Sequence, residues 1–387
     1  MGIDVEHAQK RYLRATLARR IARRHDFHDI HSLQLSIRWA AVGDGHQIMS
    51  EDTSTRRTHM ADAPLLEVRE ITKFFPIKSG LFGRATNSVR AVDGISFNVL
   101  RRETLGIVGE SGCGKSTTAR LIVDLISPEK GDILFDARRL GTDLTLNELR
   151  RNVQMVFQDS YASLNPRLTI EDTIAFGPII HGVPHEYARR LAWELLSKVG
   201  LDPKRFAGRY PHEISGGQRQ RVNIARALAV KPQIIILDES VSALDKSVEA
   251  QVLNLLLDLK KELDLTYIFI SHDLNVVKFM ADRVIVMYLG EIVEVGPVES
   301  IYAETAHPYS RSLLASMPSM DPDHRSEHVA LAGDPPNPIN PPSGCRFHPR
   351  CPIAIPKCKT EKPLLHIQKT RGHLAACHLT AQQQETF

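Results

Sequence analysis

The nine residues GESGCGKST, Gly109–Thr117, decide the fold of this 387-residue chain. They match the pattern G-x-x-x-x-G-K-[S/T] and lie between the apolar segment TLGIV and a segment with helical periodicity. Glycines in such a loop let backbone N–H groups converge on phosphate oxygens, and the dipole of the following helix favours an anion. Lys115 would neutralise the outer phosphates of a nucleotide, and the Ser116 hydroxyl would bind Mg²⁺. The stretch therefore predicts a phosphate-binding loop between a buried strand and a helix.

A second apolar run, IIIL at Ile234–Leu237, ends in two carboxylates, Asp238 and Glu239. Its length and composition are typical of a buried strand. A carboxylate at the tip of such a strand can reach the Mg²⁺ shell, and the next residue is then placed to polarise an attacking water. Because the phosphate-binding loop is present, we interpret the pair as catalytic and reject a pair of solvated surface charges.

The segments around these two motifs predict an α/β protein. Apolar and polar residues alternate over about residues 65–105, which indicates a small antiparallel sheet. Helical patterns dominate from about 147 to 230, and one of them, EYARRLAWELLSKVG, ends at Gly200, a residue typical of helix termini. Apolar strands then alternate with helices, as in a parallel sheet with crossover helices. After about Pro297 the chain becomes rich in proline, and we expect a separate appendage there.

The bulk composition decides little. The net charge of +4 comes from 49 basic and 45 acidic residues, so charge alone argues neither for nor against nucleic acid as a partner. The apolar runs are shorter than a bilayer-spanning helix needs, and the N-terminus lacks the order of a secretory signal. We therefore expect a cytoplasmic, reducing environment, in which disulfides are not favoured.

Residues 1–62 differ in character from the rest of the chain. They are rich in arginine and histidine and end in a polar stretch without periodicity. One interpretation is a basic amphipathic helix that lies on a membrane or on nucleic acid. We favour the other, a disordered or artefactual extension with the true start at Met49 or Met60, because the compact pattern begins only at LLEVREI, Leu65–Ile71.

A second glycine-bearing stretch, ISGGQ at Ile214–Gln218, lacks the lysine of a phosphate-binding loop. Its Ser215 precedes the helical segment GGQRQRVNIARALAV as a cap, so the exposed N–H groups of that helix would face an anion. Three more short pieces carry polar residues: VFQDS has Gln158, SALD has Asp245 and ISHDL has His272. In this order and spacing, the pieces resemble the nucleotide-binding subunits of ATP-binding cassette (ABC) transporters, over about residues 65–300.

The resemblance implies a role for the second loop. In that family two subunits close head to tail, and the serine and glycines of one chain contact the γ-phosphate of the ATP that the other chain holds. The resemblance also makes Glu239 the general base and His272 a contact to the γ-phosphate. Gln158 would contact Mg²⁺ and water and sense the membrane partner, and Asp245 would communicate across the dimer.

The family's adenine-stacking aromatic falls on Phe75 or, less favoured, on Phe74, and a phenylalanine of the core is the competing interpretation. Ser160 and Ser240 depart from the family, which usually has proline at both positions; we expect changed loop stiffness and no loss of function. The Mg²⁺ contacts implied are Ser116, Gln158 and Asp238. The nucleotide contacts implied are Phe75, Gly109, Glu110, Ser111, Gly112, Cys113, Gly114, Lys115, Ser116, Thr117, Ser215, Gly216, Gly217, Gln218 and Asp245.

Within the family, the segments VQMVFQDSYASLNPRLTI and YPHEISGGQRQRVNIARAL and the proline-rich tail resemble the ATP-binding subunits of dipeptide and oligopeptide permeases. The tail discriminates best, because it carries Cys345, Cys351, Cys358 and Cys377 with the spacing C-x5-C-x6-C-x18-C. Four thiolates so close together in a cytoplasmic protein suggest a metal site. We interpret the fifth cysteine, Cys113, as a tolerated small side chain of the loop and not as a reactive thiol.

The resemblance implies a [4Fe–4S] cluster on the four tail cysteines, whose spacing lacks the paired C-x2-C of zinc ribbons. One alternative is zinc, bound by four thiolates or with His378 or His348 replacing one of them. Another is four buried thiols without a metal. Because the tail lies outside the cassette motifs, we expect ATP binding at Lys115 to be largely independent of it.

Taken over the whole chain, the resemblance implies a P-loop NTPase (RecA-like) parallel-sheet core with an N-terminal antiparallel β subdomain, an α-helical signature subdomain and a small Cys-rich C-terminal tail. The expected boundaries are the extension at 1–62, the ABC nucleotide-binding domain at 63–300 with its helical subdomain at about 159–230, and the four-cysteine tail at 301–387.

The implied function is that of an ATP-binding and ATP-hydrolysing subunit that powers import of dipeptides or oligopeptides, peripheral at the cytoplasmic face of the inner (cell) membrane. Its partners would be a second ATP-binding subunit, either a related chain or a copy of itself, two integral membrane permease subunits and, indirectly, an external solute-binding protein, with no nucleic acid. The alternative is a soluble ABC ATPase acting on ribosomes or in DNA repair. Such proteins generally carry two cassettes or a long heptad insertion, whereas this sequence has one phosphate-binding loop and no heptads.

Overall fold

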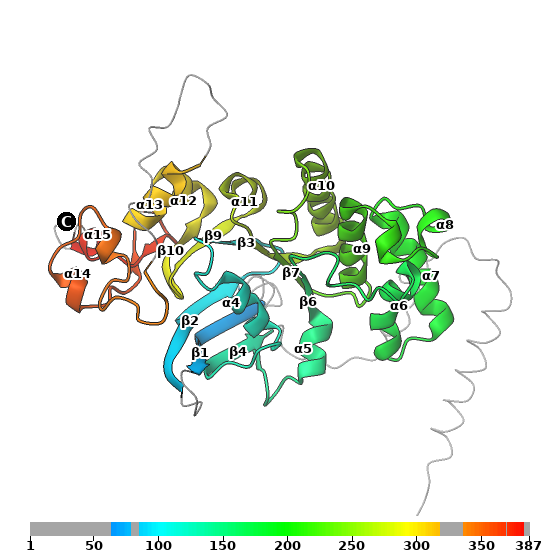
Figure 1. Ribbon diagram of the computed structural model, residues 1–387, viewed down its shortest axis with the longest axis horizontal. Coiled ribbons are helices and arrows are strands. Elements are labelled where there is room, and N and C mark those ends of the chain that lie inside the picture. The colour runs from blue at the N-terminus through cyan, green and yellow to red at the C-terminus, as the bar shows by residue number, and fades with distance from the viewer. Residues whose placement is uncertain (1–62, 79–84, 318–335, 369, 383–387) are drawn as a thin grey trace, which may run out of the picture. The chain divides into compact units, whose positions relative to one another are not determined.

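Two sheets organise the part of the chain that the structure describes. The computed structural model describes residues 63–78, 85–317, 336–368 and 370–382, so the expected extension at 1–62 lies outside the described residues. The larger sheet has eight strands in the order β11-β12-β10-β9-β3-β8-β7-β6 (Figure 1). Its bounds are β3 Thr104–Val108, β6 Val153–Val156, β7 Ile234–Asp238, β8 Thr266–Ile270, β9 Arg283–Tyr288, β10 Glu291–Pro297, β11 His366–Ile367 and β12 Leu374–Ala375.

The centre of the larger sheet is parallel. Strands β9, β3, β8, β7 and β6 pair in parallel in that order, whereas β10 pairs antiparallel with β9 and β12. Every residue of β3, β7 and β8 is buried, as the apolar runs predict for strands inside a parallel sheet. The strand β6 falls in the region 147–230, where we expected helices, because four residues are too few to show an alternation.

The smaller sheet is antiparallel, with the order β2-β1-β4-β5. It is drawn in blue and cyan in Figure 1, beside the helix that follows the phosphate-binding loop. Its inward side chains, such as Leu66 and Val68, are buried and alternate with the more exposed Glu67 and Arg69. The bounds are β1 Leu66–Lys78, β2 Ala85–Val99, β4 Lys130–Phe135 and β5 Arg138–Arg139.

Helices connect the strands and form one separate group. Helices α6, α7 and α9 pack against one another and form that group, drawn in green in Figure 1. The α-helix bounds are α4 Lys115–Ile122, α5 Leu146–Asn152, α6 Ile170–Ile180, α7 His185–Lys198, α8 Pro203–Phe206, α9 Gly216–Leu228, α10 Lys246–Leu263, α11 Leu274–Met280, α12 Val298–Ala303, α13 Pro308–Ala315, α14 Lys357–Thr360 and α15 His378–Gln382. Two short 3₁₀ helices lie at Pro211–Glu213 and His348–Arg350.

Gly200 ends helix α7 at the place that the sequence predicts. Its φ is +76°, a left-handed conformation that glycine adopts at no steric cost. Its N–H donates to Ser197 O at 3.0 Å, and the N–H of Leu201 donates to Leu196 O at 2.8 Å. These bonds satisfy carbonyls in the last turn of the helix and stop it there.

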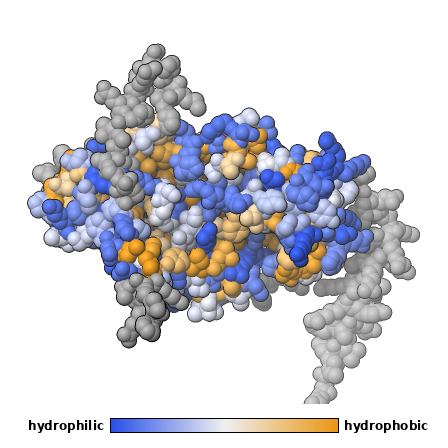
Figure 2. Space-filling model, in the orientation of Figure 1, coloured by the Kyte–Doolittle hydropathy of each residue, from blue (hydrophilic) through white to orange (hydrophobic). Residues whose placement is uncertain are grey.

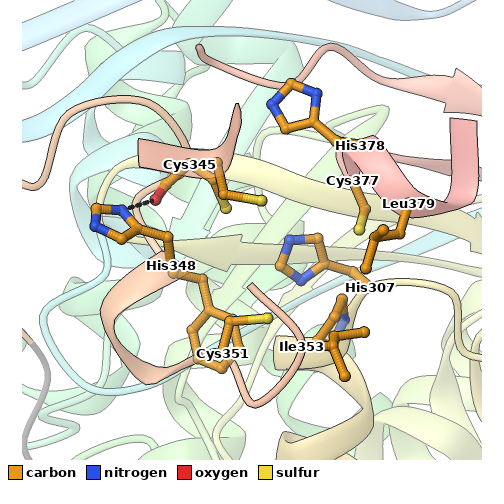
Figure 3. Close-up of a pocket in the computed structure, with 11 residues that line it drawn as sticks. His307, Cys345, His348, Cys351, Ile353, Cys377, His378 and Leu379 are labelled. Carbon is orange, nitrogen blue, oxygen red and sulfur yellow. Dashed lines mark hydrogen bonds between the residues drawn. The ribbon is translucent and has the colours of Figure 1, made fainter. Parts of the chain in front are cut away.

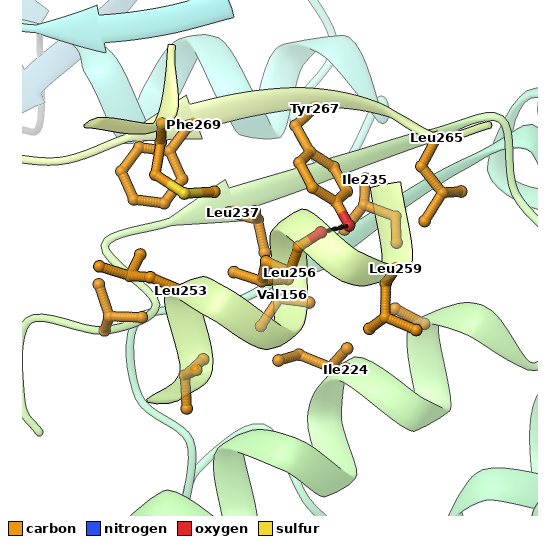
Figure 4. Close-up of a cluster of buried hydrophobic side chains, with 14 of the residues drawn as sticks. Val156, Ile224, Ile235, Leu237, Leu253, Leu256, Leu259, Leu265, Tyr267 and Phe269 are labelled. Carbon is orange, nitrogen blue, oxygen red and sulfur yellow. Dashed lines mark hydrogen bonds between the residues drawn. The ribbon is translucent and has the colours of Figure 1, made fainter. Parts of the chain in front are cut away.

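The main core lies between α10 and the central strands (Figure 4). Leu253, Leu256 and Leu259 recur on one face of α10 and are buried, and they belong to one cluster with Tyr267 and Phe269 of β8. The Tyr267 hydroxyl donates a hydrogen bond to Leu256 O at 2.9 Å, so the buried phenol is satisfied, and burial raises its pKa. The helix is therefore fixed both by apolar burial and by a polar contact.

The C-terminal tail is not a separate appendage, so that expectation is wrong. Strand β12 pairs antiparallel with β10 and thereby joins the central sheet. On β10, Glu294 is fully buried, and its carboxylate accepts the N–H groups of Ala306 and His307 and lies 2.7 Å from His373 Nε2. Phe347, also buried, packs edge-on against Tyr288. The proline-rich composition gave no sign of this docking, because the pairing is between segments far apart in the sequence.

None of the helices that the structure describes is long and apolar enough to cross a membrane. On the face shown in Figure 2, hydrophobic residues form patches that hydrophilic residues interrupt. Several large apolar side chains are nevertheless exposed on α6 and α7, among them Phe176, Ile180 and Tyr187.

The core assignment predicts a large effect at Leu256. Leu256→Ala should lower the free energy of unfolding by about 2–5 kcal/mol, because it empties a fully buried site. The matched control is Leu263→Ala on the same helix, where the side chain is 38% exposed and the loss should stay below about 1 kcal/mol. Urea denaturation of the full chain, followed by circular dichroism, measures both. Equal losses in the two variants would contradict this core.

Candidate nucleotide-binding site

The phosphate-binding loop joins β3 to α4, as the sequence predicts. Gly114 lies at the N-cap of α4 with φ 108°, and a Cβ there would lie 2.2 Å from Ala91 O. Gly109 has φ +147°, and its Cβ would lie 2.2 Å from Met287 O. Neither position accepts a side chain without a shift of the neighbouring backbone. The glycines of the motif are therefore required by the close approach of β2 and β9 to the loop.

Lys115 is turned inward over the loop. Its side chain is buried, and its Nζ donates to Gly109 O at 2.8 Å and to Glu110 O at 3.0 Å. The ammonium is thus held by carbonyls of the loop itself, at the start of a helix whose dipole favours an anion. A phosphate bound here would meet both the lysine and the free N–H groups of the first turn.

Ser116 and Asp238 meet across the edge of the sheet. The Ser116 hydroxyl donates to Asp238 Oδ1 at 2.8 Å, and Asp238 is only 2% exposed. Burial raises the pKa of this carboxyl, and the hydrogen bond from Ser116 partly offsets the shift. A hydroxyl and a carboxylate are oxygen ligands of the kind that Mg²⁺ prefers, so the donor set fits the predicted Mg²⁺ contacts.

Two predicted catalytic side chains, Gln158 and His272, approach the third, Glu239. Gln158 Nε2 donates to Glu239 Oε2 at 2.8 Å, and His272 Nδ1 lies 3.5 Å from the same oxygen. Glu239 has a positive φ of 45°, a strained conformation for this residue type, which its N–H bond to Ile270 O helps to hold. Gln158, Glu239 and His272 each follow the carboxyl end of a parallel strand, so the topology brings them to one edge.

Cys113 is a residue of the loop and is only 3% exposed. Its Sγ is 3.9 Å from Lys115 Nζ, yet burial dominates and raises the pKa of the thiol. A protonated, buried thiol is a poor nucleophile. This geometry agrees with the interpretation of Cys113 as a small packing residue.

Other predicted nucleotide contacts are not brought to this loop. Ser215 caps α9 through a reciprocal pair of bonds with Gln218: the Gln218 N–H donates to Ser215 Oγ at 3.4 Å and the Ser215 N–H donates to Gln218 Oε1 at 3.0 Å. Ser215 is exposed, and α9 lies in the green helical group, away from α4 (Figure 1). Asp245 is likewise exposed, at the start of α10.

Phe75 has an intermediate position. It pairs with Val89 in the smaller sheet, two residues before Ala91, whose carbonyl abuts Gly114 of the loop. The Nζ of Lys73 lies 5.8 Å from the ring centre, so one face of the ring is occupied by a cation. The residue is half-buried, so it is neither enclosed in the core nor fully exposed.

All four tail cysteines line one pocket, together with His307, His348 and His378. Figure 3 shows the thiols of Cys345, Cys351 and Cys377 directed into it. The cysteines are free thiols, and burial together with the neighbouring thiols raises the pKa of Cys345 to about 11. Among the described residues, however, there is no group of three or more His, Cys, Asp or Glu side chains already arranged to hold a metal ion.

Sequence reasoning missed two residues that touch the loop. The guanidinium of Arg350 pairs with Glu110, and the buried Tyr309 hydroxyl accepts the Glu110 N–H. A third missed residue, Arg346, pairs with Asp93 of β2. The available signal was two arginines between the first two tail cysteines, in the segment CRFHPRC. Charged residues in so short a segment need partners if they are buried, but the sequence does not say which.

Comparisons with known proteins agree with this geometry. The Oligopeptide transport ATP-binding protein AppF of Bacillus subtilis is 50% identical over 81% of this chain and 97% of its own length. The Dipeptide transport ATP-binding protein DppF of Haemophilus influenzae is 47% identical over 82% of this chain and 97% of its own length. The chain belongs to the ABC transporter family. Its family models are "ABC transporter", matched by residues 92–242, and "Oligopeptide/dipeptide transporter, C-terminal region", matched by residues 293–358.

Solved structures of ABC cassettes share the fold. The structure of cbiO1 from Clostridium perfringens, part of an ABC transporter complex, has 29% identity and a TM-score of 0.53, covering 62% of this chain and 91% of its own. The ATP-binding cassette MJ0796 bound to ADP and phosphate has 31% identity and a TM-score of 0.52, covering 60% and 98%. As an ABC ATPase, this chain uses ATP and Mg²⁺, and the P-loop NTPase core predicted from the sequence is confirmed.

Proposed function

We propose that this chain hydrolyses ATP to power the import of dipeptides or oligopeptides through a membrane ABC permease. The observation that carries the proposal is the edge of the parallel sheet where the phosphate loop meets the polar ends of β6, β7 and β8. The similarity to AppF and DppF and the match to the oligopeptide/dipeptide transporter C-terminal region support peptides as the cargo. The ATP site alone would fit any ABC transporter, so the choice of cargo rests on these relatives.

Within this function, Glu239 acts as the general base. Gln158 and His272 approach the same carboxylate oxygen, so they orient the base and are themselves held for contact with Mg²⁺ or the γ-phosphate. Asp238 and Ser116, already hydrogen-bonded, hold Mg²⁺. Phe75 stacks on adenine from the neighbouring sheet, with Phe74 as the alternative.

Glu239→Gln should leave ATP binding intact while ATP turnover falls by roughly two to four orders of magnitude, because the amide cannot take a proton from water. Steady-state phosphate release, measured with the partner subunits present, checks turnover, and equilibrium titration with ATP checks binding. Lys115→Ala is the contrasting variant, since it should lose binding itself. Near wild-type turnover in Glu239→Gln would remove this residue from the role.

The second glycine loop completes the site of a partner cassette. Ser215 is exposed at the N-terminus of α9, a helix of 13 residues whose first N–H groups and dipole suit an anion. Helix α9 packs against α6 and α7, in a helical group that lies away from α4 and this chain's own phosphate-binding loop (Figure 1). Ser215 through Gln218 therefore serve the γ-phosphate of ATP held by a second ATP-binding subunit. That subunit is a related chain or a copy of this one, and Asp245 lies at the same dimer interface.

Ser215→Arg should therefore block hydrolysis without weakening ATP binding at this chain's own Lys115, because the new side chain enters the partner's site. The measurement is ATP affinity of the isolated subunit alongside ATPase activity of the assembled transporter. An affinity loss as large as that of Lys115→Ala would show that the loop serves its own chain, against the shared site.

Two membrane permease subunits complete the assembly, with an external solute-binding protein as an indirect partner. The exposed apolar residues of the helical group support docking on a membrane protein, with Phe176 55% and Ile180 64% exposed on α6. Such docking places the chain peripherally at the cytoplasmic face of the cell membrane. Co-purification with an integral membrane pair separates this function from a soluble ABC ATPase of ribosomes or DNA repair, which would purify without one.

The domain boundaries belong to the same proposal: a nucleotide-binding domain at 63–300, with its helical subdomain at about 159–230, and a four-cysteine tail at 301–387. The tail cysteines hold a metal centre, with a [4Fe–4S] cluster favoured over zinc. Four thiols around one pocket support this, since a cation among them offsets the mutual repulsion of thiolates. When bound, the centre supplies ligand bonds that order a segment poor in apolar residues.

Anaerobically purified protein should carry about four irons per chain and broad iron–sulfur absorbance, and Cys351→Ser should lose both. Metal analysis and the visible spectrum check this outcome. Cys113→Ser is the matched control, because that thiol lies in the phosphate loop and should leave the metal content unchanged. Stoichiometric zinc without iron would replace the cluster with a zinc site, and neither metal would leave ordinary buried thiols.

A further inference from the structure

An arginine of the four-cysteine tail forms a bidentate ion pair with a glutamate of the phosphate-binding loop. Arg350 Nη1 lies 2.8 Å from Glu110 Oε2, and its Nη2 lies 3.1 Å from Glu110 Oε1. The Arg350 side chain is 6% exposed and that of Glu110 21% exposed, so the pair is largely shielded from water. A parallel pair of charge-assisted bonds fixes geometry as well as charge.

Glu110 is held at its backbone too. Its N–H donates to the Tyr309 hydroxyl at 2.8 Å, and its carbonyl accepts Lys115 Nζ at 3.0 Å. Tyr309 is fully buried on α13, and its ring packs on Tyr288, whose hydroxyl lies 3.4 Å from Arg350 Nη1. The N–H, carbonyl and carboxylate of one loop residue thus all have partners. Two of these partners, Arg350 and Tyr309, come from beyond residue 300.

The charge of Glu110 requires this arrangement. Glu110 is the second residue of a loop that, on the proposed function, surrounds the phosphates of ATP. An unpaired carboxylate there would repel the phosphates and would compete for Lys115, and partial burial would leave that repulsion poorly screened. The guanidinium of Arg350 compensates this charge through its two hydrogen bonds to the carboxylate.

We propose that Arg350 is a positioning residue of the ATP site, which acts through Glu110 and is supplied by the four-cysteine tail. This inference rests on the proposed ATP site at Lys115. It assigns the tail a direct part in nucleotide affinity, against the sequence-based expectation that ATP binding is largely independent of the tail. If Arg350 served only to attach the tail to the cassette, its substitution would disturb the packing of the tail. The affinity for ATP would then not depend on the charge of Glu110.

The test is a double-mutant cycle with ATP as the probe and the full chain as the protein. Arg350→Met should raise the Kd for ATP by roughly tenfold, the order of the repulsion between one uncompensated carboxylate and nearby phosphates. Adding Glu110→Gln to that variant should lower the Kd again relative to Arg350→Met alone, by roughly threefold or more, because the uncompensated charge is gone. The defect of Arg350→Met alone should also shrink as salt is raised, since salt screens the repulsion.

Three further variants distinguish a role of Arg350 from general effects of substitution in the tail or the ATP site. Arg311→Met changes an arginine of the same tail whose guanidinium donates to the Thr305 carbonyl at 3.3 Å, and this variant should bind ATP as the wild type does. Arg350→Lys, which keeps the charge, should show the smaller defect if folding is intact by thermal melting. Lys115→Ala reports on the site itself: wild-type affinity there would overturn the proposed ATP site and not only the role of Arg350.

An unchanged Kd in Arg350→Met, with Lys115→Ala impaired, would overturn the inference and leave the proposed function standing. A double variant as weak as Arg350→Met, without dependence on salt, would also overturn it, because the loss would then come from disturbed packing of the tail.

Discussion

The parallel pairing of β7 with β6 and β8 is the constraint on which the site depends. It aligns Asp238 with Ile270, so the residues that follow β6, β7 and β8 emerge at the same edge, next to the loop that follows β3. A slip of one residue would turn Asp238 to the opposite face and break its bond with Ser116. Full burial of β7 and β8 fixes this register, because a shift would remove apolar contacts on both faces of the strands.

The local parts of this fold could be predicted from the sequence, because their causes are local. The glycines of the loop, the cap at Ser215 and the stop at Gly200 are each determined by a few neighbouring residues. The apolar run before Asp238 likewise predicted a buried strand, which the structure shows as β7. The family resemblance placed Gln158, Glu239 and His272 at one ATP site, and the parallel topology of the sheet explains why their strand ends converge.

The tail could not be predicted in the same way. Its pairing of β12 with β10 involves two residues on each strand, too short a match to leave a pattern. Arg350 and Glu110 are 240 residues apart, and nothing in the composition of either segment names the other as partner. The four cysteines were visible as a set, with His348 and His378 as alternative ligands, but their shared pocket also contains His307, which precedes them in the chain and which their spacing gave no reason to include.

The docking of the tail changes how this cassette can be shortened. Glu294 of β10 is completely buried and depends on His373, just before β12, for one of its contacts. A chain cut after the last cassette motif would therefore keep a buried carboxylate without that partner and an uncovered strand edge in the central sheet. An open edge recruits further strands from other molecules. Minimal cassettes excised from this chain would thus be prone to aggregate, since the tail covers the edge of β10.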